Sequence, residues 1–212
     1  MPEPSFASTI TTVSEAAKGR GEVMMIFGPP GCGKTSLVMT LPAEKTLLYD
    51  VDGGFAVLQR KGWNGGYLPA PENMSNLKAF VEWVTTTPHK FSTVVIDTVS
   101  MMERRMVFAL AASRGKDIVD VREFGDAATK LRQYLIQLRD LSAKKINVIF
   151  LGHLKTDVKG AEGEKHVFLS DKLAREVYGW CDSVGYMGLN PDGSRYLQFA
   201  GMLGYPTKSR HD

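Results

Sequence analysis

The segment that most constrains this chain is Gly28-Pro29-Pro30-Gly31-Cys32-Gly33-Lys34-Thr35, which matches the pattern G-x-x-x-x-G-K-[ST]. This pattern is typical of a phosphate-binding loop between a strand and a helix, and the apolar run at 23–27 stands directly before it. Such a loop needs glycines because its backbone N–H groups must wrap around a diphosphate without obstruction from Cβ atoms. We therefore predict a strand, a P-loop and a helix in this order, with a nucleotide bound at the loop.

Individual positions of the motif suggest individual contacts. We expect the Lys34 ammonium to lie on the β- and γ-phosphate oxygens and the Thr35 hydroxyl to bind Mg²⁺. Lys34 is therefore a candidate catalytic residue, and Thr35 is a candidate metal ligand. The residues expected to bind the nucleotide are Gly28, Pro29, Pro30, Gly31, Cys32, Gly33, Lys34, Thr35 and Ser36.

Hydrophobic periodicity indicates an α/β fold in which a mostly parallel sheet is flanked by helices, because short β-branched apolar runs alternate with longer amphipathic stretches. The turn-forming run Asn190-Pro191-Asp192-Gly193 predicts an antiparallel hairpin at the C-terminal edge of the sheet. The expected strands are 23–27, 46–51, 93–97, 147–152, 183–187 and 195–199. The expected helices are 34–41, 76–86, 100–112, 126–143 and 171–178.

The remaining segments are expected to be loops or an arm. Loops are predicted at 60–76, 113–125 and 155–165, the first rich in Gly and Pro and the last containing two glycines. No internal repeat or shift of composition marks a second domain. We therefore expect residues 1–212 to form a single domain, with residues 1–20 as an N-terminal arm or an extra edge strand.

Composition excludes several classes of protein. Hydrophobic residues make up 43% and charged residues 23% of the chain, which is ordinary globular usage and excludes collagen-like and disordered chains. Two cysteines are too few for a disulfide framework and favour a reducing compartment. No stretch approaches the ~18 consecutive apolar residues of a membrane helix, so we expect a cytoplasmic protein without a membrane partner. The net charge of +3 is too small to argue for nucleic acid by itself.

A P-loop needs a carboxylate on a neighbouring strand for the metal, and Asp97 ends the apolar run at 93–97. The alternative is that Asp97 caps the helix expected from Ser100. The P-loop upstream and the break at Thr98 favour the metal-binding role. Asp97 is therefore our candidate Walker B residue, with a catalytic role and a share in binding the metal.

Two carboxylates follow the strand expected at 46–51. Asp50 and Asp52 are two residues apart, and such side chains point to the same side of a strand. Asp52 leads into the pair Gly53-Gly54 and is our candidate general base, which would orient water for in-line attack on the γ-phosphate. The alternative is that this Asp closes the turn before Gly53.

His153 follows the apolar strand expected at 147–152, at the edge of the sheet where open α/β folds bind ligands. An isolated histidine most often has a structural role, but this one directly precedes a glycine-containing segment. We expect His153 to sense the γ-phosphate and to pass its presence to that segment.

The P-loop, Asp50-Val51-Asp52-Gly53-Gly54, Val95-Ile96-Asp97-Thr98 and Gly152-His153-Leu154-Lys155 together resemble the motifs of RecA-like core ATPases. More narrowly, residues 20–210 resemble the phage-encoded Sak-type proteins associated with ATP-dependent single-strand annealing. The resemblance implies a RecA-like core that binds ATP and Mg²⁺ and hydrolyses ATP, in the cytoplasm of the host if a phage encodes it. It places Asp52 where the family has a longer Glu, which implies slow hydrolysis or a different base. It places His153 where the bacterial recombinase has a Gln that couples nucleotide state to DNA.

The same resemblance implies a homo-oligomeric ring or filament that acts on single-stranded DNA, with a single-strand binding protein as a further partner. The loops at 113–125 and 154–166 would face the DNA, and Lys155, Lys159 and Lys165 are the best candidate contacts. Residues 154–166 hold three basic and three acidic side chains, so ordinary solvated charge is the alternative reading. The most basic stretch is 129–145, with five basic residues and one acidic residue.

The C-terminal run Pro206-Thr207-Lys208-Ser209-Arg210 resembles a Lys-x-Arg element of the family. The resemblance implies that Lys208 or Arg210 supplies a cation to the γ-phosphate of a neighbouring subunit, as an arginine finger does. A disordered chain end is the alternative.

Three other classes of function stay open. A small-molecule P-loop kinase would carry an Arg-bearing lid, whereas 155–165 contains no Arg. An AAA-type loader or remodeller would add a helical lid, for which we expect no room after the last strand. A nucleotide switch that acts on a protein partner is compatible with the short carboxylate of Asp52.

Overall fold

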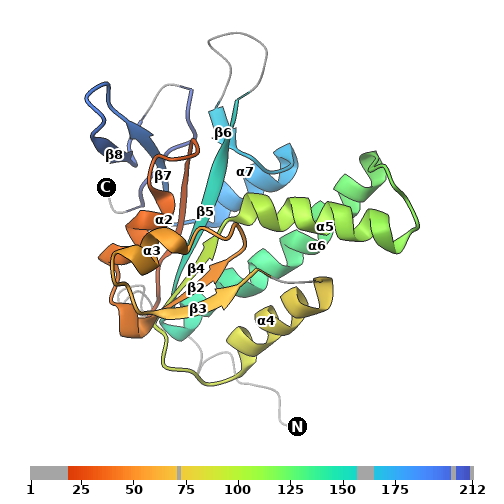
Figure 1. The fold of residues 1–212 in the computed structure, drawn as a ribbon, viewed down its shortest axis with the longest axis horizontal. Helices are drawn as coiled ribbons and strands as arrows, with labels where there is room; N and C mark the ends of the chain where they lie inside the picture. The colour runs from red at the N-terminus through yellow and green to blue at the C-terminus, as the bar shows by residue number, and fades with distance from the viewer. Residues whose placement is uncertain (1–18, 71–72, 157–164, 202–203, 211–212) are drawn as a thin grey trace, which may run out of the picture.

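The computed structural model describes residues 19–70, 73–156, 165–201 and 204–210. The expected N-terminal arm falls almost entirely outside these residues, as does Lys159. Within them the chain forms one mixed sheet with helices on both faces (Figure 1). None of the helices in these ranges is long and apolar enough to cross a membrane.

The sheet is mostly parallel, with strand order β3-β2-β4-β5-β1-β7-β8 and with β6 paired to β5. Only the β7–β8 and β5–β6 pairs are antiparallel. The predicted α/β class and the predicted C-terminal hairpin are therefore confirmed. The strands are β1 (Val23–Gly28), β2 (Thr46–Asp50), β3 (Gly66–Pro69), β4 (Thr93–Asp97), β5 (Asn147–Thr156), β6 (Lys165–Val167), β7 (Ser183–Leu189) and β8 (Arg195–Gln198).

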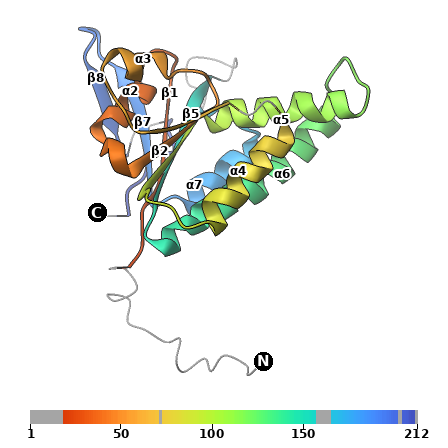
Figure 2. The same ribbon diagram turned by 60° about the horizontal axis from the view of Figure 1, so that its bottom comes forward.

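Helices cover the two faces unequally. The longer helices α4 to α7 pack on one face, while the short α2 and α3 lie on the other (Figure 2). Strand alternation divides the core accordingly, because Val94 and Ile96 of β4 belong to the larger apolar cluster and Val95 belongs to the smaller one. The helices are α2 (Lys34–Leu37), α3 (Ala56–Arg60), α4 (Met74–Thr86), α5 (Val99–Ser113), α6 (Val121–Arg139) and α7 (Asp171–Trp180), with 3-10 turns at Val38–Thr40, Ala43–Lys45 and Asp140–Lys144.

Each of the three predicted loops contains some regular structure, and 155–165 contains it at its two ends, in β5 and β6. Helix α6 begins at Val121, so the prediction of a loop to residue 125 was wrong. The cause is a capping box, in which the Asp120 carboxylate accepts backbone N–H groups of the first turn while the Glu123 carboxylate accepts the N–H of Asp120. In the Gly/Pro-rich segment 60–76, β3 pairs with β2 and extends the sheet by one strand.

Two other elements end at residues different from those predicted. In one, the strand hydrogen bonds continue beyond the apolar run, and in the other the helix changes to 3-10 geometry. Strand β5 continues to Thr156, past the predicted end at Gly152, and pairs with β6. The helix expected at 34–41 is α-helical only to Leu37 and then tightens into a 3-10 turn that ends at Thr40.

Helix α6 supplies much of the larger core through a row of leucines at helical spacing. Leu131, Leu135 and Leu138 are each 0% exposed and belong to the same cluster as the strand residues Val148 and Phe150. This row confirms the apolar face that the sequence predicts for the helix.

We predict that Leu135→Ala lowers the free energy of unfolding by about 2–5 kcal/mol, because it leaves a cavity between α6 and the sheet. Urea denaturation followed by circular dichroism would measure the loss. The neighbouring Gln133 is exposed, so Gln133→Ala should change stability by less than about 0.5 kcal/mol. Equal losses in the two variants would contradict this assignment of the core.

Candidate nucleotide-binding site

The P-loop leaves β1 at Gly28 and enters α2 at Lys34. Two of its residues have backbone conformations that favour glycine, Gly31 with φ 78° and Gly33 with φ 105°. The loop is closely packed at its start, because a Cβ on Gly28 would lie 2.1 Å from the carbonyl oxygen of Met187. The local sequence therefore permits the tight backbone curve that a diphosphate requires.

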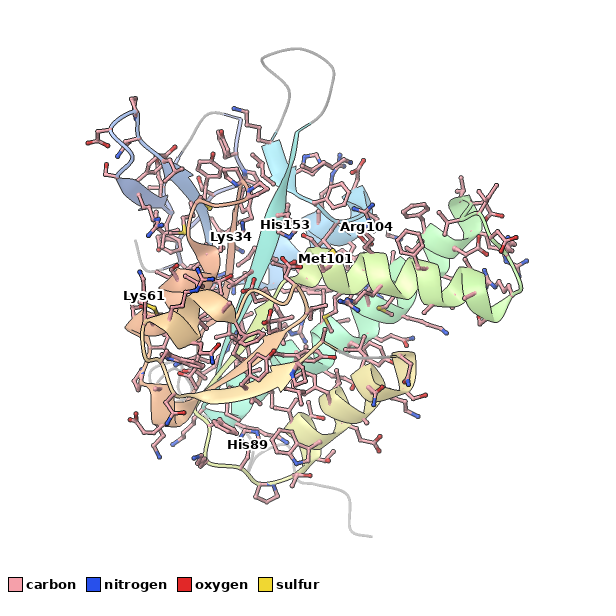
Figure 3. All side chains as sticks on the ribbon, in the orientation of Figure 1. Lys34, Lys61, His89, Met101, Arg104 and His153 are labelled. Carbon is pink, nitrogen blue, oxygen red and sulfur yellow. The ribbon has the colours of Figure 1, made fainter. Side chains whose placement is uncertain are left out.

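Lys34 is only 6% exposed, and its ammonium is folded over the loop (Figure 3). It donates hydrogen bonds of 3.0 Å to the carbonyl oxygens of Gly28 and Pro29. It also contacts Cys32 Sγ at 3.9 Å. A buried ammonium with these partners favours an anion nearby. Phosphate oxygens would supply that anion.

Asp97 and Thr35 meet at the end of β4. The Thr35 hydroxyl donates to Asp97 Oδ2 at 2.5 Å. The capping role that was the alternative for Asp97 belongs instead to Thr98, whose hydroxyl accepts the N–H of Met101 in the first turn of α5. Asp97 therefore stays directed at the P-loop, although its binding of a metal remains a prediction.

The chemistry of these two groups fits Mg²⁺. A hydroxyl and a carboxylate are hard oxygen ligands, and Mg²⁺ takes few protein ligands when phosphates supply the others. Burial, together with the negative charges of Asp52 and Asp50, raises the pKa of Asp97 to about 6. A divalent cation would offset that penalty. In the described ranges no group of three or more His, Cys, Asp or Glu side chains is arranged to hold a metal ion.

Asp50 and Asp52 have different partners although Asp50 ends β2 and Asp52 lies only two residues further on. Asp50 is 0% exposed, and its carboxylate accepts the backbone N–H groups of Gly53, Gly54 and Phe55 at 2.8–3.0 Å. Asp50 therefore closes the turn, which was the alternative role considered for Asp52. The pattern Asp-x-x-Gly is a signal of such side-chain-closed turns, and it was the signal for Asp50 that sequence reasoning passed over.

Asp52 is bound by His153, which comes from β5. His153 Nε2 lies 2.7 Å from Asp52 Oδ2, and the Thr98 hydroxyl donates to Asp52 Oδ1 at 3.3 Å. Gly28 pairs in register with His153, so the histidine lies at the same edge as the P-loop (Figure 3). The predicted base and the predicted sensor therefore form one hydrogen-bonded pair beside the P-loop, and their catalytic roles remain predictions.

His153 also connects the site to the next hairpin. Its backbone N–H donates to the Ser100 hydroxyl at 3.0 Å, and its carbonyl oxygen accepts the N–H of Phe168 at 2.7 Å. Phe168 directly follows β6. A movement of His153 would therefore be transmitted to the β5–β6 hairpin by a direct backbone hydrogen bond.

The lysines predicted to contact DNA lie on this hairpin. Lys155 Nζ donates to Asp171 Oδ1 at 2.8 Å. Lys165 lies 5.2 Å from the centre of the Tyr205 ring, and its backbone N–H donates to Gly204. The structure therefore brings these two lysines to adjacent strands.

Lys208 and Arg210 bind their own chain at the opposite end of the sheet. Arg210 Nη1 lies 3.1 Å from Asp182 Oδ1, and Lys208 forms a backbone bridge with Val184. Asp182 in turn binds the N–H of Val23, the first residue of β1, whereas the P-loop follows the last residue of that strand. These two cations therefore lie away from the P-loop of their own protomer.

The comparisons with known proteins agree with this site and fold. A family model described as an AAA domain matches residues 20–211. Among solved structures, the chain is similar to an ATPase from the type III secretion system of pathogenic bacteria, with a TM-score of 0.54 and 16% identity over 82% of this chain and 52% of that one. At this identity the similarity shows a RecA-like ATPase fold alone, and the chain spans about half the length of that structure. No curated protein matches the sequence.

We predict that Asp50→Asn destabilises the protein by about 1–3 kcal/mol, because the amide group that replaces one carboxylate oxygen cannot accept the backbone N–H groups of the turn. The matched variant Asp52→Asn, which alters a partly exposed contact with His153, should cost less than about 1 kcal/mol. Thermal and urea unfolding of both variants would measure the difference. The reverse order of stabilities would show that the turn depends on Asp52.

Proposed function

Because the chain belongs to the AAA domain family of P-loop ATPases, we propose that it binds ATP with Mg²⁺ and hydrolyses it. The observation that carries this proposal is the meeting of the Thr35 hydroxyl with the Asp97 carboxylate at the end of the P-loop. Thr35 belongs to α2 and Asp97 ends β4, and together they form the hydroxyl and carboxylate pair that P-loop ATPases use for the metal.

In the proposed reaction, Lys34 exchanges the carbonyl oxygens of Gly28 and Pro29 for the β- and γ-phosphate oxygens. Mg²⁺, held by Thr35 and Asp97, would neutralise charge on the phosphate oxygens. Asp52 orients the attacking water and accepts its proton. For that role the Asp52 carboxylate must turn from His153 toward the water. The contact between Asp52 and His153 therefore breaks during the reaction.

In this proposal His153 transmits the state of the nucleotide to the β5–β6 hairpin. When the γ-phosphate attracts the imidazole, the Asp52–His153 pair at 2.7 Å opens, and the hydrogen bond from Phe168 N–H to the His153 carbonyl moves with it. The β5–β6 hairpin then responds to the presence of the γ-phosphate. In this proposal nucleotide state controls the surface that carries Lys155 and Lys165.

We propose single-stranded DNA as the partner of that surface, in a homo-oligomeric assembly that acts in phage-type recombination or annealing. The support is the resemblance of the ordered motifs to Sak-type proteins, together with the basic side chains of the β5–β6 hairpin. Each protomer offers few cations, so many protomers must add their contacts to bind a polyanion firmly. In such an assembly Arg210 would leave Asp182 to reach the γ-phosphate of a neighbour.

A second candidate is an ATPase that acts on a protein partner. The observation that favours it is a mainly apolar groove of about 420 Å³ between α5, the start of α6 and the segment before α7. Three exposed aromatic side chains line the groove, Phe108, Phe124 and Phe168. Exposed apolar surface of this kind is typical of protein-binding sites.

We predict that Lys34→Ala reduces ATP turnover to background and weakens ATP binding by at least about tenfold, because the P-loop loses the ammonium expected to bind the β- and γ-phosphates. Calorimetric titration with a non-hydrolysable ATP analogue and a phosphate-release assay would measure the two effects. Lys61, exposed after α3 (Figure 3), provides the matched control Lys61→Ala. Turnover at the wild-type rate in Lys34→Ala would refute the site.

Asp52→Asn should bind ATP as the wild type does but hydrolyse it about 10²–10⁴ times more slowly, because the amide cannot accept the proton of the attacking water. Single-turnover hydrolysis would separate the chemical step from binding. Asp117→Asn, at an exposed aspartate between α5 and α6, controls for the loss of one negative charge. An unchanged rate in Asp52→Asn would remove it as the base.

ATP turnover should rise when an oligothymidylate is added, and the binding of that DNA should weaken as salt increases. Duplex DNA of equal length is the control for polyanions in general. Lys155→Ala combined with Lys165→Ala should reduce the stimulation while leaving the basal rate unchanged. Absence of both stimulation and salt-dependent binding would favour the protein-partner alternative.

A further inference from the structure

The β7–β8 hairpin brings Arg195 against the P-loop. A Cβ on Gly33 would lie 2.7 Å from Arg195 Nε and 3.1 Å from Cζ, so the guanidinium occupies the space beside this glycine. Figures 1 and 2 both show β8 next to α2, at the edge of the sheet to which the P-loop belongs. No sequence motif marks Arg195, because the register of the hairpin alone carries it to this position.

Arg195 has no anionic partner in the part of the chain that the structure describes, and no side-chain hydrogen bond is formed by it there. It is exposed. Five of the ten other arginines in the described residues are paired with carboxylates, namely Arg20, Arg114, Arg132, Arg139 and Arg210. A guanidinium that lies against an anion-binding loop without a carboxylate partner is available to an anionic ligand.

The hairpin holds Arg195 in place. Leu189 pairs with Arg195 and Met187 with Leu197 across the two strands. The turn is closed by hydrogen bonds from Asn190 N–H to the Ser194 carbonyl and from Gly193 N–H to the Asn190 carbonyl. Leu197 packs against the smaller apolar cluster. The position of Arg195 is therefore set by regular structure.

The strand order indicates which phosphates Arg195 can reach. Strand β1 lies between β5, which carries His153, and the β7–β8 pair. The γ-phosphate is expected beside the Asp52–His153 pair. Arg195 approaches the P-loop from the opposite side. The backbone of a P-loop cradles the α- and β-phosphates, and Gly33 belongs to that backbone.

We propose that Arg195 binds the α- and β-phosphate oxygens of the nucleotide, an inference that rests on the nucleotide binding proposed above. The planar fork of a guanidinium matches two phosphate oxygens, which a lysine at the same place would not match. ATP and ADP share these phosphates. The contact therefore stabilises substrate, transition state and product alike, and it changes the binding of the nucleotide without changing the chemical step.

Arg195→Ala, Arg195→Lys and the wild type should be titrated calorimetrically with MgADP and with inorganic pyrophosphate, and their kcat and KM for ATP should be measured. For Arg195→Ala we expect an ADP Kd and an ATP KM about tenfold higher, with kcat within about twofold of the wild type. Pyrophosphate binding should weaken by a similar factor, since the contact is with phosphate. Arg195→Lys should recover part of the affinity.

Arg122→Ala is the matched control, because Arg122 is exposed in the first turn of α6, and Figure 1 shows that α5 and α6 extend away from α2. An unchanged ADP Kd in Arg195→Ala would overturn this inference alone. So would a weaker ADP affinity with pyrophosphate binding unchanged, which would indicate contact with the ribose or base. A fall in kcat at constant KM would place the contact on the γ-phosphate instead. Absence of ADP binding by the wild type would overturn the proposed function as well.

Discussion

Parallel pairing of β4 with β2 and β5 is the constraint on which the rest of the site depends. In this register Asp97 lies beside Asp50 of β2 and beside Leu151 of β5, and Leu151 pairs with Ile26 of β1. Strands β2 and β4 therefore end at the same level, and the end of β1 and His153 within β5 lie at the same edge of the sheet. A shift of β4 by one residue would turn Asp97 to the other face of the sheet and remove it from Thr35.

Three carboxylates meet at this edge, and their partners give them different properties. The Asp50 carboxylate accepts hydrogen bonds from three backbone N–H groups, and Asp52 is paired with His153. Asp97 has the single hydroxyl of Thr35 and is buried, so its pKa rises. Identical side chains thus acquire three different environments, since backbone N–H groups bind Asp50, the side chains of His153 and Thr98 bind Asp52, and the Thr35 hydroxyl binds Asp97. The carboxylate with the fewest donors is the one that a divalent cation would stabilise most.

The sequence was informative wherever structure is local. The P-loop could be predicted because its glycines encode the backbone, and the central strands could be predicted because runs such as 93–97 are apolar on both faces. The start of α6 was missed because a capping box outweighed the loop-like composition before it. The contact between Asp52 and His153 joins residues 101 positions apart, and Arg195 reaches Gly33 through hairpin register. Such contacts depend on packing that no local pattern encodes.

The way Asp50 closes its turn has a consequence for how the site can change. Because the backbone of residues 53–55 is held by Asp50, the side chain at position 52 contributes little to the stability of the turn. A longer carboxylate at position 52 could therefore be introduced without loosening the turn that presents it. Catalytic strength and conformational stability are in this way assigned to separate residues, and a lineage or a designer could adjust the first while leaving the second intact.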